Sequence, residues 1–128
     1  IELDSSLLYE KECIFSRHNA ASSEEKNRDI DSKKGILGLE SMFCNEYNGL
    51  NRVDLNIPSY YPTNPQAEVL IFGTVEPKYI KRIIMQSNDD VIKFSQRYKN
   101  INIEQDDCFF GPRRDWEFWQ GGVSSFGI

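Results

Sequence analysis

Two stretches of the chain alternate apolar and polar residues in a way that predicts β-strands. Residues 3–15 alternate imperfectly, which suits one or two partly exposed strands. Residues 66–74 give the clearest signal, because apolar side chains occupy both faces of the expected strand after Ala67. We therefore expect this second strand to be central in its sheet and buried on both sides.

Apolar residues recur at helical spacing in two other stretches. One covers residues 36–43, where Gly38 weakens the signal, and we expect a helix there that packs on the core. The other covers residues 89–98, whose apolar side chains would lie largely on one side of a helix.

Capping residues mark two shorter elements. Ser22 precedes acidic residues in the way that starts many helices, so residues 23–30 predict a short polar helix or loop. Pro77 suits the first turn of a helix, and this helix would run into a strand at residues 83–85.

A long stretch between these elements, residues 45–65, has almost no periodic pattern and is rich in Asn and Pro. Long irregular loops inside a compact domain are uncommon and are usually functional. Strand and helix signals alternate irregularly around the loop, and no internal repeat is visible. The pattern as a whole predicts an α+β domain with a functional loop at about residues 45–66.

Composition narrows the class of protein. The chain has 128 residues, of which 39% are hydrophobic and 12% aromatic, and this suits one folded domain and excludes a disordered chain. It starts at Ile1 with strand-like residues and no initiator Met, so we expect a chain cut within a domain. No apolar run approaches the roughly 20 residues that cross a bilayer, and we expect a cytoplasmic protein without a membrane partner.

Cysteine usage and charge restrict the kinds of site. Cys13, Cys44 and Cys108 are widely spaced and His18 is the single histidine, so we expect reduced cysteines and no metal. The formal net charge of −5 disfavours binding of nucleic acid through many phosphates, so any DNA contact must be local or partly supplied by the missing part of the chain. The candidate cations for such a contact are Arg52, Lys78, Lys81, Arg82, Arg113 and Arg114.

Glu68 is the one charged residue near the start of the apolar strand, directly after the irregular loop. A carboxylate there would be held by a rigid element and would face whatever the loop covers. The residues alone leave a second interpretation open, in which Glu68 is solvated or paired with a nearby Arg at the end of the strand.

Several segments are similar, in the same order, to those of the DarT family. F-S-R-H-N-A-A-S at residues 15–22 is similar to the family's F-x-D-G-N-A-A-S. P-T-N-P-Q-A-E-V-L-I at residues 62–71 and P-K-Y-I at residues 77–80 resemble its Q-A-E-V-L-V and P-x-x-Y-I segments. R-R-D-W at residues 113–116 resembles its closing R-x-D-aromatic segment, so that the resemblance spans about residues 7–119.

The resemblance implies a DNA ADP-ribosyltransferase of toxin–antitoxin and phage-defence systems. Its fold would be α+β and related to the poly-ADP-ribose polymerases, with a mixed sheet and short helices. NAD⁺ would be the co-substrate without a metal, single-stranded DNA the target, and a macrodomain antitoxin a partner.

The same resemblance assigns residues to the site. The family's catalytic Glu opens a strand just after the loop that grips the target, which makes Glu68 the catalytic carboxylate and places the gripping part of the loop at about residues 51–66. The candidate DNA-binding residues are Asn51, Arg52, Tyr60, Tyr61, Thr63 and Gln66.

The chain also departs from the family. Arg17 and His18 stand where the family has an acidic residue and Gly, and we expect His18 to be a turn residue. The family's N-terminal half, with a His-containing NAD⁺ loop and a catalytic Arg, has no counterpart in these residues. We therefore expect a C-terminal portion of one domain that needs that half for a cofactor site and for activity.

Two other functions stay open: a non-catalytic nucleic-acid or protein interaction module of the same fold, and an ADP-ribosyltransferase that modifies protein. Placement of residues 66–74 in a helix or on a sheet edge would end the argument from the resemblance.

Overall fold

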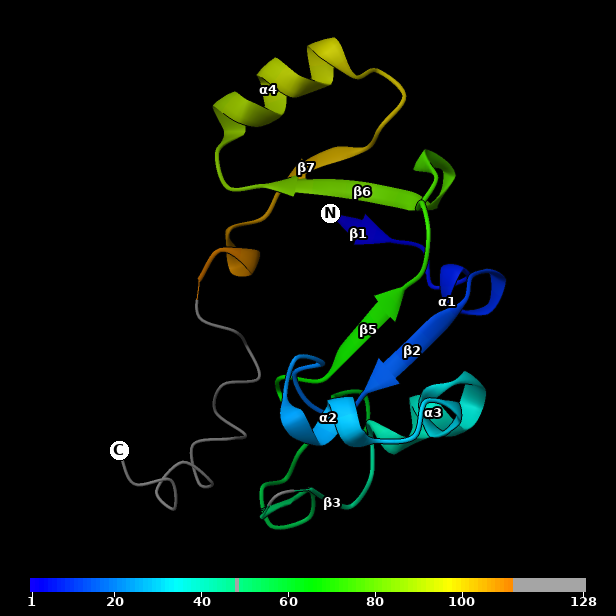
Figure 1. The fold of residues 1–128 in the computed structure, drawn as a ribbon. Coiled ribbons are helices and arrows are strands. Elements are labelled where there is room, and N and C mark those ends of the chain that lie inside the picture. Colours follow the sequence, from blue (N-terminus) through cyan, green and yellow to red (C-terminus); the bar gives the residue numbers. More distant parts are fainter. Residues whose placement is uncertain (48, 112–128) are drawn as a thin grey trace. The chain divides into compact units, whose positions relative to one another are not determined.

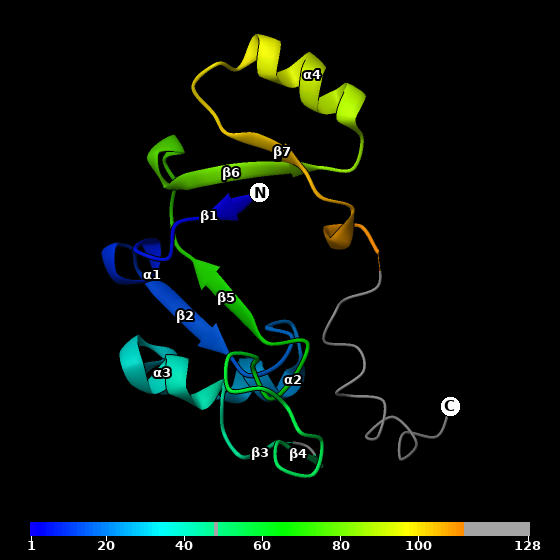
Figure 2. The ribbon, with the colours of Figure 1, turned by 180° about the vertical axis from the view of Figure 1, so that it is seen from behind.

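The computed structural model describes residues 1–47 and 49–111, and their contacts fall into two compact units. Unit 1 contains residues 1–11 and 73–111, and unit 2 contains residues 12–47 and 49–72. Figures 1 and 2 show the elements of both units from opposite sides. Each unit is described by itself below.

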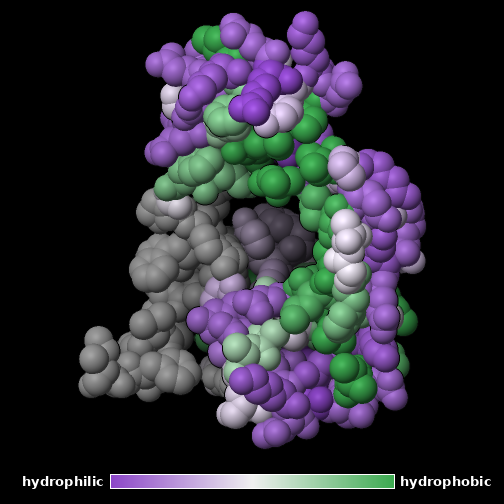
Figure 3. All heavy atoms as spheres, turned by 45° about the horizontal axis from the view of Figure 1, so that its top comes forward, coloured by the Kyte–Doolittle hydropathy of each residue, from purple (hydrophilic) through white to green (hydrophobic). Residues whose placement is uncertain are grey.

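Unit 1 is built on a small mixed sheet in the order β1-β6-β7. β6 (Ile80–Met85) pairs with β1 (Glu2–Leu3) in antiparallel and with β7 (Ile103–Gln105) in parallel orientation. Because parallel neighbours need a crossover connection, β6 and β7 are joined by α4 (Asn88–Arg97). Hydrophilic residues dominate the surface around α4 (Figure 3).

Three short helical elements complete unit 1: α1 (Leu7–Glu10) and the 3₁₀ turns Pro77–Tyr79 and Asp107–Phe109. Leu7 and Tyr79 are buried, and the Tyr79 hydroxyl donates a 2.8 Å hydrogen bond to the Glu10 carboxylate. The core of this unit is therefore small and is closed by a buried tyrosine whose polar end is satisfied.

Unit 2 is centred on the antiparallel pair of β2 (Cys13–Ser16) and β5 (Glu68–Ile71). The register opposes Cys13 to Ile71 and Ser16 to Glu68. Between these strands the chain forms α2 (Ser23–Asn27), a 3₁₀ turn (Asp31–Lys33), α3 (Gly35–Ser41), β3 (Glu46–Tyr47) and β4 (Leu50–Asn51).

One face of the β2–β5 pair forms the core of unit 2. Cys13 and Phe15 on β2 are buried there, and α3 packs against β2. Gly38 of α3 is buried against the 3₁₀ turn, where a Cβ would overlap the backbone carbonyl of Lys33. The glycine that weakened the helical signal is therefore the residue that lets this turn approach α3.

Most of the helices expected from the sequence are present, but several elements differ from the expectation in type or were not expected. The helices expected at residues 36–43 and 89–98 are confirmed as α3 and α4, and of the helix or loop expected at residues 23–30 the structure shows a helix, α2. The helix expected after Pro77 is only a 3₁₀ turn. The helix α1 and the strand β7 were not predicted.

The expectation that residues 66–74 form a central, doubly buried strand is wrong. β5 covers only Glu68–Ile71 and pairs with β2 alone among the described strands. Its second face is not covered, since Leu70 and Phe72 are 36% and 46% exposed. Alternation of apolar residues showed two apolar faces, but it could not show whether another layer packs on each of them.

The described residues also bear on cysteine pairing, membrane-spanning helices and metal sites. Cys13, Cys44 and Cys108 are free, and only Cys13 is buried, which raises the pKa of its thiol. No helix within residues 1–47 and 49–111 combines the length and apolarity needed to cross a bilayer. The same residues contain no cluster of His, Cys, Asp and Glu able to hold a metal ion.

Candidate functional site

Glu68 stands at the first position of β5, where the irregular loop ends. Just before it, the Ala67 amide donates to the Asn64 carbonyl at 3.0 Å, and buried Asn64 anchors this turn. The antiparallel register then places Glu68 opposite Ser16, the last residue of β2. The loop end and the ladder together fix the backbone that carries the carboxylate.

The Glu68 carboxylate is held by a backbone amide and not by a cation. Its Oε2 accepts a 3.0 Å hydrogen bond from the amide of Ala20, in the turn that follows β2. Glu68 is exposed and forms no ion pair with any residue in the described part of the chain. No cation within residues 1–47 and 49–111 therefore pairs with this negative charge at the start of β5.

Arg52 organises the loop that precedes Glu68. Its guanidinium donates 2.8 Å hydrogen bonds to the backbone carbonyls of Tyr61 and Pro58, and a 3.1 Å bond to the Thr63 hydroxyl. It also lies 5.8 Å from the centre of the Phe43 ring. A cation with so many protein partners shapes the loop from inside.

Two further candidate DNA-binding residues also hold the loop together. The Asn51 side-chain oxygen accepts from the amide of Val53 at 2.9 Å, and its amide group donates to Glu46 at 2.9 Å. Thr63 is buried, and its hydroxyl donates to the Cys44 carbonyl. These side chains fix the loop backbone.

Tyr60, Tyr61 and Gln66 lie at the surface of the loop. Tyr60 is 74% exposed, and its ring packs at a 54° tilt on the ring of Tyr61, with 4.7 Å between centroids. Gln66 is exposed two residues before Glu68. The loop thus carries an aromatic pair with an open ring and a polar side chain close in sequence to the carboxylate.

A buried charge cluster lies behind this region of unit 2, and sequence reasoning missed it. Glu25 of α2 is fully buried, and its carboxylate lies 3.2 Å from Arg28, 3.6 Å from Arg17 and 3.8 Å from Lys33. Glu25 stands three residues after the cap residue Ser22, a pattern that signals a helix start but not burial of its acidic residue.

Arg17 and His18, the residues that depart from the family, both contact Tyr47. The Arg17 guanidinium lies 4.9 Å above the Tyr47 ring, and the His18 ring lies 6.2 Å from it at a 44° tilt. Burial, with the Glu24 carboxylate nearby, raises the pKa of Tyr47 to about 12. The two residues pack the end of β2.

Three of the cations considered for DNA phosphates are paired with acidic residues in unit 1. Arg82 binds Glu2 and Glu104 and holds the pKa values of both carboxyl groups below their usual range. Lys81 lies 3.0 Å from Glu2, and Lys78 lies 3.6 Å from Glu10. Arg113 and Arg114 lie outside the described residues.

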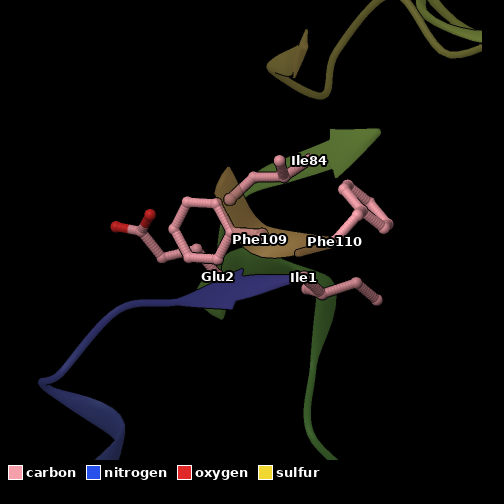
Figure 4. A pocket seen from close by; sticks show the side chains of 5 residues that line it. All are labelled: Ile1, Glu2, Ile84, Phe109 and Phe110. Atoms are coloured by element: carbon pink, nitrogen blue, oxygen red, sulfur yellow. The ribbon is translucent and has the colours of Figure 1, made fainter. Parts of the chain in front are cut away.

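Two shallow hollows have volumes of about 390 Å³ each, and Glu68 lines neither of them. The hollow in unit 1 is lined by Ile1, Ile84, Phe109 and Phe110, with Glu2 at its rim (Figure 4). The hollow in unit 2 lies at the β3–β4 turn. Glu46 and Asp54 line it, and their charge disfavours phosphate there.

Comparison with known proteins gives the family. No curated protein sequence matches the chain at the significance required. β5 has a single strand partner among the described residues, and the expectation that such an edge position would end the resemblance is wrong, because strand partners depend on segments far from the motif. The family model described as ssDNA thymidine ADP-ribosyltransferase, DarT, matches residues 1–117, nearly the whole chain. The chain therefore belongs to the DarT family.

Proposed function

We propose that this chain carries the catalytic carboxylate and the DNA-gripping loop of an enzyme that transfers ADP-ribose from NAD⁺ to thymine in single-stranded DNA. The observation that carries the proposal is the state of Glu68, an exposed carboxylate on a rigid strand that is held by a backbone N–H and balanced by no described cation. Family membership supplies the substrate class, since the family description names thymidine.

The charge of Glu68 suits the chemistry of glycosidic cleavage. When the bond between ribose C1′ and the nicotinamide nitrogen breaks, nicotinamide leaves with the bonding electrons and positive charge builds on the ribose. A carboxylate beside the 2′-hydroxyl stabilises this oxocarbenium-like state more than the ground state. An ion-paired glutamate would supply much less stabilisation, because its partner would cancel the field at the ribose.

Thymine offers a nucleophile that needs a base. In thymidine N1 bears the sugar, so N3 carries the ring N–H that must be lost when N3 bonds to ribose C1′. Glu68 accepts this proton in the proposed reaction, help that is typically worth about 10²–10⁴-fold in rate. The products are N3-linked ADP-ribosyl-thymine, nicotinamide and a proton.

The loop supplies the grip on the base. A base displayed from a single strand stacks on the open ring of Tyr60, with Tyr61 behind it, and Gln66 hydrogen-bonds near the carboxylate. Asn51, Arg52 and Thr63 contribute by holding the loop in shape, because their polar groups already bind loop residues.

The wider role that we propose is that of a toxin in a toxin–antitoxin or phage-defence system, with a fold related to the poly-ADP-ribose polymerases and a macrodomain antitoxin that reverses the modification. In this proposal Glu68 acts at the ribose end of NAD⁺. The described residues offer no complete site for the rest of the dinucleotide.

Glu68→Gln in the full-length natural protein tests the proposal. The change keeps size and removes charge, so transfer of labelled ADP-ribose to single-stranded oligonucleotides should fall at least about 10²-fold with the melting temperature nearly unchanged. Glu40→Gln, at another exposed glutamate of unit 2, is the matched control and should leave transfer unchanged.

Near wild-type transfer by Glu68→Gln would remove this residue from the mechanism. A collapse of its melting temperature would instead favour a structural role. Label that enters protein and not DNA would identify a protein-modifying enzyme, and absence of transfer by the wild type would favour a binding module.

A further inference from the structure

The turn at residues 19–22 directs one backbone amide at Glu68. The Ala21 amide donates to the side-chain oxygen of Asn19 at 2.8 Å, and the Ser22 amide donates to the Asn19 carbonyl at 2.9 Å. Ala20 lies between Asn19 and Ala21, and its amide donates to Glu68 Oε2 at 3.0 Å. Two oxygens of Asn19 thus fix the turn that delivers the Ala20 N–H to the carboxylate.

We propose that Asn19 is a positioning residue for Glu68, and this inference rests on the catalytic role proposed for Glu68. Asn19 does not touch the carboxylate. Its side chain closes an Asx turn, a conformation that a residue without a side-chain acceptor holds less firmly. The closed turn keeps the Ala20 amide aimed at Oε2, and the amide keeps the Glu68 side chain in one rotamer.

Holding one carboxylate oxygen leaves the other for substrate. Glu68 Oε1 has no hydrogen-bond partner among residues 1–47 and 49–111, while Oε2 is held by Ala20. An exposed glutamate without such a contact would sample several rotamers, and ordering it during the reaction would cost conformational entropy. Preorganisation by the turn meets that cost during folding.

A backbone amide is also the kind of donor that this reaction tolerates. It restrains the carboxylate through a hydrogen bond but brings no formal charge, whereas Arg or Lys would offset the negative charge needed beside the ribose. The position of the Asn19 turn at the end of β2, opposite the start of β5, makes this contact available without a cation.

The other role for Asn19 would be to start α2, but Ser22 performs that task. The Ser22 hydroxyl accepts the Glu25 amide at 3.2 Å, which caps the helix, and the buried Glu25 carboxylate binds Arg28 within the same region. The capping group of α2 and the acceptor that closes the turn are therefore different side chains. Substitution of Asn19 spares the cap.

The experiment compares Asn19→Ala and Asn19→Asp with the wild type in the full-length natural protein. Asn19→Ala removes the acceptor, and we expect kcat for transfer to single-stranded DNA to fall about 10-fold with both KM values within about 2-fold. Asn19→Asp keeps the acceptor and should restore most of kcat. Asn27→Ala, at an exposed asparagine of α2, is the matched control and should leave kcat unchanged.

A double-mutant cycle with Glu68→Asp separates positioning from structure. The shorter side chain no longer reaches the Ala20 amide, so Asn19→Ala should cost nothing further in that background. All variants should melt within about 4 °C of the wild type, as expected for exposed positions.

The inference is overturned by a wild-type kcat for Asn19→Ala, by failure of Asn19→Asp to restore kcat, or by a full further loss in the Glu68→Asp background. If Glu68→Gln is inactive while Asn19→Ala is not impaired, only the positioning role fails. If Glu68→Gln stays active, the proposed function itself fails, and the positioning role fails with it.

Discussion

The guanidinium of Arg52 donates a 2.8 Å hydrogen bond to the backbone carbonyl of Tyr61, nine residues further along the loop. The same group also donates to the Pro58 carbonyl. The side chain that looked like a phosphate ligand in the sequence is therefore a brace that sets the path of the loop beneath its tyrosines. Charge and shape can be separated experimentally at this position.

Arg52→Lys keeps the charge but cannot satisfy the three acceptors that the planar guanidinium reaches. We expect the free energy of unfolding to fall by about 1–3 kcal/mol, together with faster proteolytic cleavage within the loop. Arg97→Lys, on exposed α4, is the control and should change neither. If Arg52 served only to neutralise phosphate, lysine would preserve both loop protection and stability.

Tyr60→Ala tests the grip on DNA. Because Tyr60 is largely exposed and would stack on a base, its removal should weaken single-stranded DNA binding by about 1–3 kcal/mol, measured by fluorescence anisotropy, while NAD⁺ hydrolysis without DNA continues. Tyr61→Ala added to Tyr60→Ala should weaken binding further. Equal loss of both activities would show that the tyrosines support the fold. Tyr9→Ala, at an exposed tyrosine of unit 1, provides the comparison.

Gly38→Ala should destabilise the protein although alanine favours helices. Helix propensity alone would stabilise the variant by about 1 kcal/mol, but the new methyl group would overlap the Lys33 carbonyl, and such overpacking typically costs about 1–3 kcal/mol or more. Chemical denaturation should therefore show a net loss. Gly111→Ala meets nothing within 4 Å and should be nearly neutral, and an equally neutral Gly38→Ala would contradict the packing described for α3.

The raised pKa of Tyr47 predicts that the protein loses stability at alkaline pH. Its pKa is about 12 in the folded protein against 10.0 for an ordinary tyrosine, so above pH 10 the unfolded chain releases the phenolic proton first. Stability contributed by the protonated phenol is complete below pH 10 and is lost as the pH rises toward 12. Thermal melts from pH 9 to 11.5 should show the wild type losing stability relative to Tyr47→Phe, and parallel profiles would refute the shift.

Local signals in the sequence predicted the helices and the position of Glu68 at the start of a strand. They did not predict which strands pair with one another. α2, α3 and α4 depend on caps and apolar spacing within a few residues, which the sequence displays. The strand β7 is defined by its pairing with β6, which lies far from it in sequence. The edge position of β5 likewise depends on the strands available to pair with it, and β2 is its one partner among the described strands.

The sequence likewise predicted only part of the candidate site. Asparagine and proline marked the loop, and the motif around Glu68 marked the carboxylate, so both could be predicted. The Ala20 amide that holds Glu68 lies 48 residues away, and backbone groups leave no trace in a residue pattern. The engagement of Arg52 with loop carbonyls was hidden for the same reason, since its acceptors belong to the backbone.

The four-residue ladder between β2 and β5 decides which changes of chain length the protein can absorb. Residues added or removed within the loop before Asn64 leave the ladder in register, but they disturb the hydrogen bonds that Arg52 and Asn51 make within the loop. One residue inserted between Asn64 and Glu68 would shift the pairing by one position and place Glu68 opposite Phe15, on the core face. A change of length before Asn64 therefore disturbs the loop, whereas a change between Asn64 and Glu68 moves the carboxylate itself to the other face of the strand.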